Sequence, residues 1–235
     1  MCILDKELIK STVGITIFPK KPNKIDIYCM TSVEHGEKMT NSIAVFCGSA
    51  FGADSIFLET AQNVGKTIAQ QGKTLVYGGG RSGLMGVIAD NALKEGGKVV
   101  GVIPEILVNK ELAHPNLTEL HIVNNMQERK LKMSELSDGF IALPGGVGTF
   151  EEIFEQWTWA QLGIHLKPCA FLNVDGFYDD LIKFLEKSTE KGFTHPRFMQ
   201  SLIHDSSIEK VMNQMDHFIA PEPKWGMVEK VQTEN

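Results

Sequence analysis

The sequence contains little cysteine, and its cysteines are widely spaced. Only four occur in 235 residues, at positions 2, 29, 47 and 169, and no two of them form a Cys-x-x-Cys pair. This spacing disfavours a disulfide framework and a cysteine-based zinc site. The seven histidines show no ligand spacing such as His-x-x-x-His. We therefore expect free thiols in a reducing cytoplasm, and no metal ion or cofactor.

Long apolar runs and an excess of positive charge are also missing. No run reaches about 18 apolar residues, the length that would predict a transmembrane helix. Residues 1–10 lack the basic stretch and apolar core of a secretory signal. The net charge of −6 argues against a nucleic-acid-binding surface. We expect a cytoplasmic chain with no membrane or nucleic-acid partner, and a nucleotide in a local pocket stays compatible with this charge.

Short apolar segments alternate with helical patterns through most of the chain. Strands are predicted at 43–47, 74–77, 98–103, 120–123, 140–143 and 169–172, and helices at 55–71, 84–94, 126–136, 150–162, 177–190 and 206–217. Strands that are apolar on both faces and alternate with helices indicate a parallel sheet covered on both sides. The predicted fold class is therefore α/β, with a doubly wound parallel sheet in a single domain.

The two ends of the chain carry weaker patterns than its middle. Residues 1–40 contain two possible short strands around a turn rich in Pro and Lys, and we interpret them as an N-terminal extension of unknown structure. Residues 41–220 form the predicted domain. Residues 221–235 are predicted to be a mobile tail.

Three turns that contain glycine, at 48, 78–80 and 145–148, each follow a predicted strand. Ligands of open parallel sheets bind at the carboxyl ends of the strands, which makes Ser49 and Gly80 candidate binding residues. The third turn reads Pro-Gly-Gly-Val-Gly-Thr-Phe-Glu-Glu from 144 to 152. It predicts free backbone N–H groups, a helix N-terminus and an acid around one small anion. Glu151 and Glu152 would then lie in the first turn of that helix.

Plainer explanations exist for two of these patterns. Thr149 and Glu152 have the spacing of a capping box, in which Glu152 would only satisfy the Thr149 amide. The three glycines favour a ligand instead, because backbone that approaches a phosphate needs glycine and a plain cap does not. Residues 78–83 match the G-x-G-x-x-G dinucleotide pattern. They follow the second predicted strand rather than the first, so a tight turn explains them more simply.

A second polar cluster begins the helix predicted at 126–136. Its spacing places Arg129 and Lys130 near the face that holds Met126 and Met133. An arginine on an apolar face costs free energy unless it is paired or binds an anion. The alternative is a side chain that extends along the apolar surface and keeps its charge in water.

Together these motifs resemble the LOG family, the cytokinin riboside 5′-monophosphate phosphoribohydrolases. The resemblance rests on Tyr-Gly-Gly-Gly at 77–80, Gly-Leu-Met-Gly at 83–86, Met-Gln-Glu-Arg-Lys at 126–130, the glycine turn at 144–152 and Trp-Ala-Gln-Leu-Gly-Ile-His at 159–165. It covers about residues 42–190. Gln127 departs from the family, which usually has histidine there.

The resemblance implies a Rossmann-like fold, a homodimer, and hydrolysis of the N-glycosidic bond of a purine nucleoside 5′-monophosphate such as AMP. The products would be a free base and ribose 5-phosphate. Carried over by position, Arg129 and Glu152 are the catalytic pair. The implied substrate contacts are Glu111, Arg129, Lys130, Gly145, Gly146, Val147, Gly148, Thr149, Glu151 and Thr158.

Two other classes of function stay open at this point. A non-catalytic carrier or sensor, such as the molybdenum-cofactor carriers that share this fold, is disfavoured by the combination of Arg129 and Glu152. A pyridine-nucleotide oxidoreductase is favoured only by the glycines of 78–83. Lysine decarboxylation is not expected, because no lysine stands out as a Schiff-base former.

Overall fold

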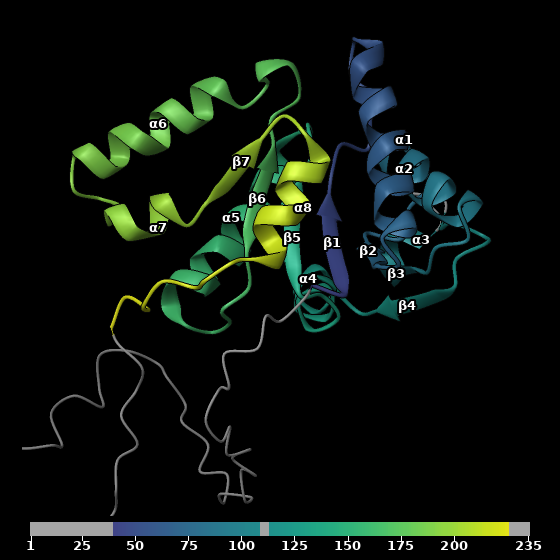
Figure 1. Ribbon diagram of the computed structural model, residues 1–235. Helices are drawn as coiled ribbons and strands as arrows, with labels where there is room; N and C mark the ends of the chain where they lie inside the picture. Colours follow the sequence, from purple (N-terminus) through teal and green to yellow (C-terminus); the bar gives the residue numbers. More distant parts are fainter. Residues whose placement is uncertain (1–39, 109–112, 226–235) are drawn as a thin grey trace, which may run out of the picture. The chain divides into compact units, whose positions relative to one another are not determined.

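The computed structural model describes residues 40–108 and 113–225, which belong to one compact unit, Glu37–Asn235. Its seven strands are β1 (Ser42–Phe46), β2 (Thr74–Tyr77), β3 (Val99–Pro104), β4 (Glu119–Val123), β5 (Gly139–Ala142), β6 (Cys169–Leu172) and β7 (Ile203–Asp205). They form one parallel sheet in the order β4-β3-β2-β1-β5-β6-β7 (Figure 1). The α/β class and the parallel sheet predicted from the sequence are confirmed.

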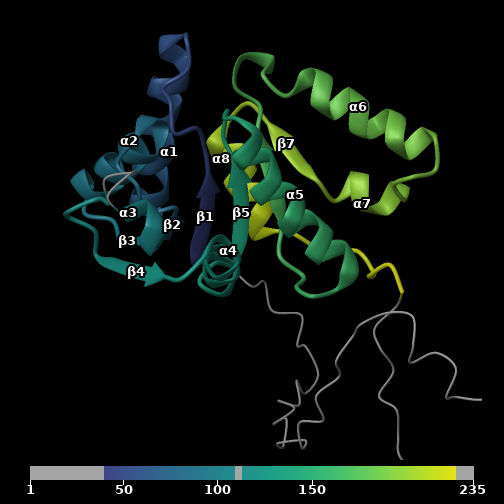
Figure 2. The ribbon, with the colours of Figure 1, turned by 180° about the vertical axis from the view of Figure 1, so that it is seen from behind.

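Helices cover both faces of this sheet. They are α1 (Ser55–Gln70), α2 (Gly83–Lys94), α3 (Glu105–Val108), α4 (Met126–Glu135), α5 (Val147–Leu162), α6 (Asp179–Glu190), α7 (Pro196–Gln200) and α8 (Ile208–Asp216), with a 3-10 turn η1 (Val174–Gly176). In Figure 1 helices α1, α2 and α8 lie in front of the sheet, and in Figure 2, seen from behind, α4 and α5 lie in front. The doubly wound arrangement is thus present.

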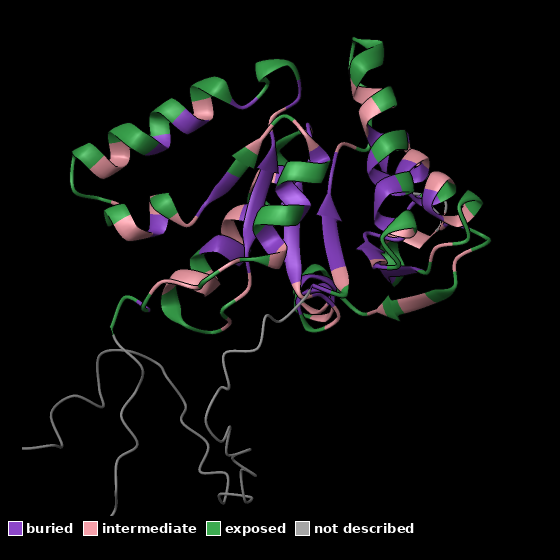
Figure 3. Cartoon of the chain, viewed as in Figure 1, coloured by how far each residue is buried: buried purple, intermediate pink, exposed green. Residues whose placement is uncertain are grey.

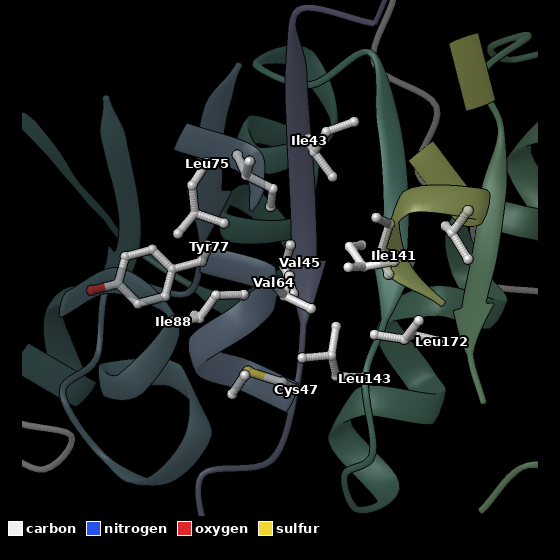
Figure 4. Packing of buried hydrophobic residues seen from close by; sticks show 14 of the residues in the cluster. Ile43, Val45, Cys47, Val64, Leu75, Tyr77, Ile88, Ile141, Leu143 and Leu172 are labelled. Atoms are coloured by element: carbon white, nitrogen blue, oxygen red, sulfur yellow. The ribbon is translucent and has the colours of Figure 1, made fainter. Parts of the chain in front are cut away.

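The alternation of side chains along β1 divides the core into two layers. Ile43, Val45 and Cys47 pack with α1, α2 and α8, whereas Ala44 and Phe46 pack with α4, α5 and α6. This is the two-residue period of a strand whose two faces are both covered. Figure 3 shows the central strands buried over most of their length, and Figure 4 shows the first layer around β1. Full burial of each large apolar side chain contributes about 1.5–3 kcal/mol.

The structure differs from the sequence prediction in a few elements. Helix α5 begins at Val147 rather than Phe150, because Gly146 is already its N-cap. The short elements α3, α7 and β7 were not predicted from the sequence. They span only three to five residues each, too few for a hydrophobic period to be recognised.

The predicted N-terminal extension lies outside the described residues apart from Thr40, and the predicted tail does so beyond Trp225. Of the described tail residues, Pro223 is buried, and the Lys224 amide donates to the Gln161 carbonyl at 2.8 Å. Among the described residues, no helix combines the length and the apolar character needed to span a bilayer.

Candidate active site

The candidate site lies where the strand order of the sheet reverses. Strand β1 pairs with β2 on one side and with β5 on the other, and the chain turns away from the sheet after all three. The Gly48 amide donates to the Pro144 carbonyl at 3.1 Å, and the Leu84 amide donates to the Gly48 carbonyl at 3.1 Å. Two backbone hydrogen bonds thus tie the turn at Gly48 to the start of α2 and to the residue before the turn at 145–148, at the usual ligand-binding position of an open parallel sheet.

Gly83, at the start of α2, and Gly145, in the third turn, are both required by the close approach of neighbouring atoms. A Cβ on Gly83 would lie 2.3 Å from the Ser49 carbonyl carbon, and Gly83 has a φ of +54°. A Cβ on Gly145 would lie 2.2 Å from the Thr149 hydroxyl oxygen and 2.9 Å from the Gly48 nitrogen. Both positions therefore have a structural reason to be glycine that involves no ligand.

Gly146 and Gly148 are different. A Cβ at either position would meet no atom within 4 Å, and both residues are exposed. Nothing in the described part of the chain requires glycine at these two positions. A ligand that comes close to the backbone would supply the reason that the protein does not.

The N-terminus of α5 is open at this turn. Gly146 is the N-cap and has no side chain with which to cap, so the amides of Val147, Gly148 and Thr149 have no intrahelical acceptor. The capping-box interpretation is wrong, because Thr149 is the third residue of the helix and not its N-cap. The placement of Glu151 and Glu152 in the first turn is also wrong, because the helix starts three residues earlier than predicted.

Arg129 is held inside the protein by the turn after β2. Its side chain is only 5% exposed, and its Nη2 donates to the Gly78 carbonyl at 3.2 Å. A Cβ on Gly78 would lie 1.9 Å from that Nη2, so this glycine provides the space for the guanidinium. The Nε of Arg129 is buried and has no hydrogen-bond partner in the described part of the chain. The alternative of a solvated arginine is therefore wrong, and an anion could accept from the remaining N–H groups.

Glu152 and Arg129 lie near the same thiol. Burial raises the pKa of Cys47, the Glu152 charge raises it further, and the Arg129 charge opposes the rise. Since such electrostatic influence requires proximity, residues on α5 and α4 meet beside the end of β1. Glu152 is partly exposed. The two residues proposed as a catalytic pair thus both act on the buried thiol at the end of β1.

Lys130 and Glu151 contact each other across α4 and α5. The ammonium of the buried Lys130 forms ion pairs with Glu151 and, at 3.0 Å, with Glu155. Burial lowers the pKa of Lys130, but hydrogen bonds to these two carboxylates outweigh that effect and raise it. In this structure both predicted substrate contacts are engaged with protein groups, and together with Glu155 they hold the two helices side by side.

Of the remaining predicted residues, Ser49 lies at this site, whereas Thr158 does not. Ser49 is exposed in the turn after β1, and Gly80 is buried and forms a β-bridge with Ala113. Glu111 lies outside the described residues. Thr158 is exposed and donates to the Phe154 carbonyl at 2.7 Å. It is eleven residues after Val147, about 16 Å along α5. Thr158 is therefore too far from the glycine turns of its own chain to share a ligand contact with them.

A cavity of about 270 Å³ opens between the turns after β1 and β5. Its residues are Gly48, Ser49, Ala50, Phe51, Gly52, Phe57, Leu84, Pro144, Gly145, Gly146 and Phe177. Its three phenylalanines and the role of Gly78 were not predicted from the sequence. Phe51 and Phe177 follow predicted strands within a few residues. That position alone could have indicated that they lie at the carboxyl ends of the strands.

The chemistry available here is that of an anion site with one carboxylate. Open amides, a helix N-terminus and an arginine can hold a phosphate, and Glu152 can act on a group bound beside it. Within residues 40–108 and 113–225, no three His, Cys, Asp or Glu side chains gather as metal ligands would.

The sequence is similar to a protein family and to relatives with a named activity. The model of the family described as "Possible lysine decarboxylase" matches residues 85–215. A probable cytokinin riboside 5′-monophosphate phosphoribohydrolase of Oryza sativa subsp. japonica is 42% identical over 193 residues, which are 80% of this chain and 86% of the relative. A cytokinin riboside 5′-monophosphate phosphoribohydrolase of Rhodococcoides fascians is 48% identical over 169 residues, 72% and 85% of the two chains.

The fold is also shared with more distant proteins. The structure of the molybdenum cofactor binding protein of Rippkaea orientalis matches 77% of this chain and 98% of its own with a TM-score of 0.59. The sequence identity is 20%. At that identity the likeness establishes the fold and carries no function.

Proposed function

The chain belongs to the LOG family of cytokinin riboside 5′-monophosphate phosphoribohydrolases, and on that premise we propose that it is an N-glycosidase of purine nucleoside 5′-monophosphates. It hydrolyses the bond between the base and C1′ of the ribose. Water supplies the hydroxyl group that C1′ gains. The base leaves with the bonding electron pair and takes up a proton, so the products are free base and ribose 5-phosphate.

Glu152 is the residue that carries this proposal. Cleavage of a ribosyl bond develops positive charge on the sugar, as in glycoside hydrolysis, and a carboxylate beside C1′ stabilises that charge and orients the attacking water. Glu152 is the sixth residue of α5, beyond the first turn in which the helix dipole is strong. Arg129, whose charge acts on the same Cys47 thiol, would supply a positive charge to the same site.

The 5′-phosphate binds at the turn 145–149. The amides of Val147, Gly148 and Thr149 are available at the N-terminus of α5, and the absence of a Cβ at 146 and 148 lets the phosphate approach the backbone. Arg129 anchors the phosphate or the ribose through its remaining N–H groups. Lys130 and Glu151 contact substrate only if their ion pair opens, which makes them secondary to this arrangement.

The carrier alternative rests on fold likeness at 20% identity, whereas relatives at 42–48% identity are named as hydrolases. The hydrolase is therefore the better supported function. The oxidoreductase alternative loses its basis, because Gly78 makes room for Arg129 and Gly83 for the Ser49 backbone. Both glycines thus have reasons that involve no dinucleotide.

The finer parts of the proposal concern assembly, substrate and compartment. A homodimer is supported by large apolar side chains that α4 and α5 expose on the same side of the sheet, Leu131 and Val147. AMP is proposed as a substrate alongside the cytokinin nucleotides. The cytoplasm is proposed as the compartment, consistent with the free thiols of Cys47 and Cys169.

The experiment that tests the function compares the wild-type protein with Glu152→Gln. The wild type should release adenine from AMP, or the substituted base from a cytokinin nucleotide, with ribose 5-phosphate in equal amount. Glu152→Gln should bind AMP normally and lose turnover by about 10²-fold or more, because the neutral amide cannot stabilise the cationic sugar.

Glu135→Gln is a matched control, because it makes the same substitution at an exposed glutamate at the end of α4. Its turnover should equal that of the wild type. Near-wild-type turnover in Glu152→Gln would refute the role of this carboxylate. AMP binding by the wild type without any release of base would favour the carrier.

A further inference from the structure

A second cavity, of about 390 Å³, lies at the other end of α5. It is bordered by the end of α6, the segment that leads into α7, and the chain near residue 224. Its residues are Gln161, Thr189, Gly192, Phe193, Thr194, His195, Pro196, Arg197, Phe198 and Lys224. The volume is in the range of small-molecule sites, and no part of the function proposed above uses it.

The charged residues that line this cavity have one sign. Arg197 and Lys224 are cationic, and no Asp or Glu occurs among the described residues that line the cavity. The Nδ1 of His195 accepts from the Arg197 amide at 3.3 Å, so the ring proton of the neutral imidazole is on Nε2, where it can be donated. On a chain with a net charge of −6, such a local excess of donors and positive charge is suited to an anion.

The guanidinium of Arg197 is held in a fixed orientation. It lies over the Phe198 ring at 4.8 Å from the ring centre, and its Nη2 donates to the Pro223 carbonyl at 3.1 Å. Its Nε is buried and has no hydrogen-bond partner in the described part of the chain. A buried donor without an acceptor costs free energy, and native structures usually supply the acceptor. The missing acceptor is the observation that points to a ligand.

This cavity is separate from the candidate active site. Gln161, which lines it, is fourteen residues after Val147, which is about 21 Å along α5. A nucleotide bound at the N-terminus of α5 with its ribose beside Glu152 therefore does not reach Arg197 in the same chain.

We propose that the cavity lined by Arg197, His195 and Lys224 binds a small phosphate monoester. The Nε–H and a neighbouring N–H of Arg197 form the paired donors that suit phosphate oxygens, and Lys224 supplies a second charge for the dianion. The cavity is larger than a phosphate ion needs. The remaining space, beside Phe193, Phe198 and the Thr189 and Thr194 hydroxyls, takes the organic part of the ester.

The test is a titration with ribose 5-phosphate followed by the side-chain Nε–H resonance of Arg197 in nitrogen-15 NMR spectra of the full chain. That resonance reports this cavity alone, so ligand bound at the active site does not interfere. It should shift and saturate. Lys224→Gln should weaken the binding about tenfold through the loss of one charge, whereas Lys183→Gln, an exposed lysine on α6 outside the cavity, should leave it unchanged.

Two comparison ligands define the chemical class. Acetate and free ribose should each shift the resonance far less than ribose 5-phosphate at equal concentration. Binding of acetate as strong as that of the phosphate ester would overturn the phosphate assignment. An Arg197 resonance that stays in place, or equal affinity in Lys224→Gln and the wild type, would overturn the site. Neither result bears on the release of base at Glu152.

Discussion

Among the described residues, the polar groups at the amino ends of the strands have hydrogen-bond partners, and those at the carboxyl ends in part do not. We call these two sides of the sheet its amino edge and its carboxyl edge. At the amino edge, the buried ammonium of Lys73 contacts Asp216 at 2.7 Å and the Thr40 carbonyl at 2.6 Å, and Thr40 also bonds to Asp216. At the carboxyl edge, the amides at the start of α5 are open and the Nε of Arg129 has no partner in the described part of the chain. One edge is saturated with partners and the other is not.

The difference separates residues that stabilise the fold from residues that await a ligand. A buried ion pair with every partner present needs nothing more, and removal of either partner leaves a buried charge. A buried donor without an acceptor, such as the Nε of Arg129, costs stability, whereas the exposed amides at Val147 and Gly148 can be solvated by water until a ligand binds. Changes at the amino edge should therefore lower stability and leave turnover intact. Changes at the carboxyl edge should lower turnover and leave stability intact.

Asp216→Asn should have the largest effect on stability. It leaves the Lys73 ammonium, 6% exposed, without its counter-ion, and we expect a loss of about 3 kcal/mol in the free energy of unfolding, with unchanged turnover per folded molecule. Chemical denaturation and an assay of base release measure the two quantities. A large loss of turnover in fully folded protein would contradict the division between the edges.

The same ion pair makes the stability of the protein depend on pH in the acid range. Burial raises the pKa of Asp216, but hydrogen bonds from Lys73 and Thr40 outweigh this and hold it below the usual 3.8. A carboxyl with a lowered folded pKa stabilises the fold at pH values above its unfolded pKa and ceases to do so as the pH falls through the folded one. The wild type should therefore lose this contribution below about pH 4, and Asp216→Asn should lack that part of the pH dependence.

Gly78→Ala should have the next largest effect, at the opposite edge. The new Cβ would lie 1.9 Å from the Arg129 Nη2. Since the end of a side chain moves more easily than backbone, the guanidinium should shift and the fold should persist. We expect about a tenfold loss in kcat/KM, mainly through weaker nucleotide binding. Arg129→Ala should also weaken nucleotide binding, and its loss in kcat/KM should be larger.

Gly65→Ala is the matched control for that variant. Its Cβ would lie 2.3 Å from the Ile88 carbonyl, where α1 and α2 pack together and no site residue is near. It should lower the melting temperature and leave kcat/KM of the folded protein unchanged. Unaltered kcat/KM in Gly78→Ala would show that the position of Arg129 does not matter for the reaction.

The buried strands of this molecule were predicted from the sequence more accurately than the exposed start of α5. The six predicted strands are all present, because runs such as Ile43 to Cys47 are buried on both faces and their pattern is local. The start of α5 was displaced by three residues. A helix that begins at an exposed Gly-Val-Gly has neither a capping side chain nor an apolar period to mark it.

Site residues were predictable as motifs and not as contacts. Arg129 and Glu152 could be selected from their patterns, but only the fold shows that Gly78 makes the space for the guanidinium. Likewise the charges of Lys130 and Glu151 were visible in the sequence. Their ion pair depends on α4 and α5 lying side by side, which is a long-range property of the sheet order.

The smallest predicted effect is that of Gly148→Ala, which should change stability and ligand binding in opposite directions. Gly148 lies in the first turn of α5, and a Cβ there would meet nothing within 4 Å. Because alanine has the higher helix propensity, Gly148→Ala should raise the free energy of unfolding by up to about 0.5–1 kcal/mol in the absence of ligand. The same methyl group would stand where a phosphate approaches the amides, so AMP binding should weaken. Calorimetry of unfolding and of AMP binding would measure both changes, and a more stable variant that binds AMP as well as the wild type would place the phosphate elsewhere.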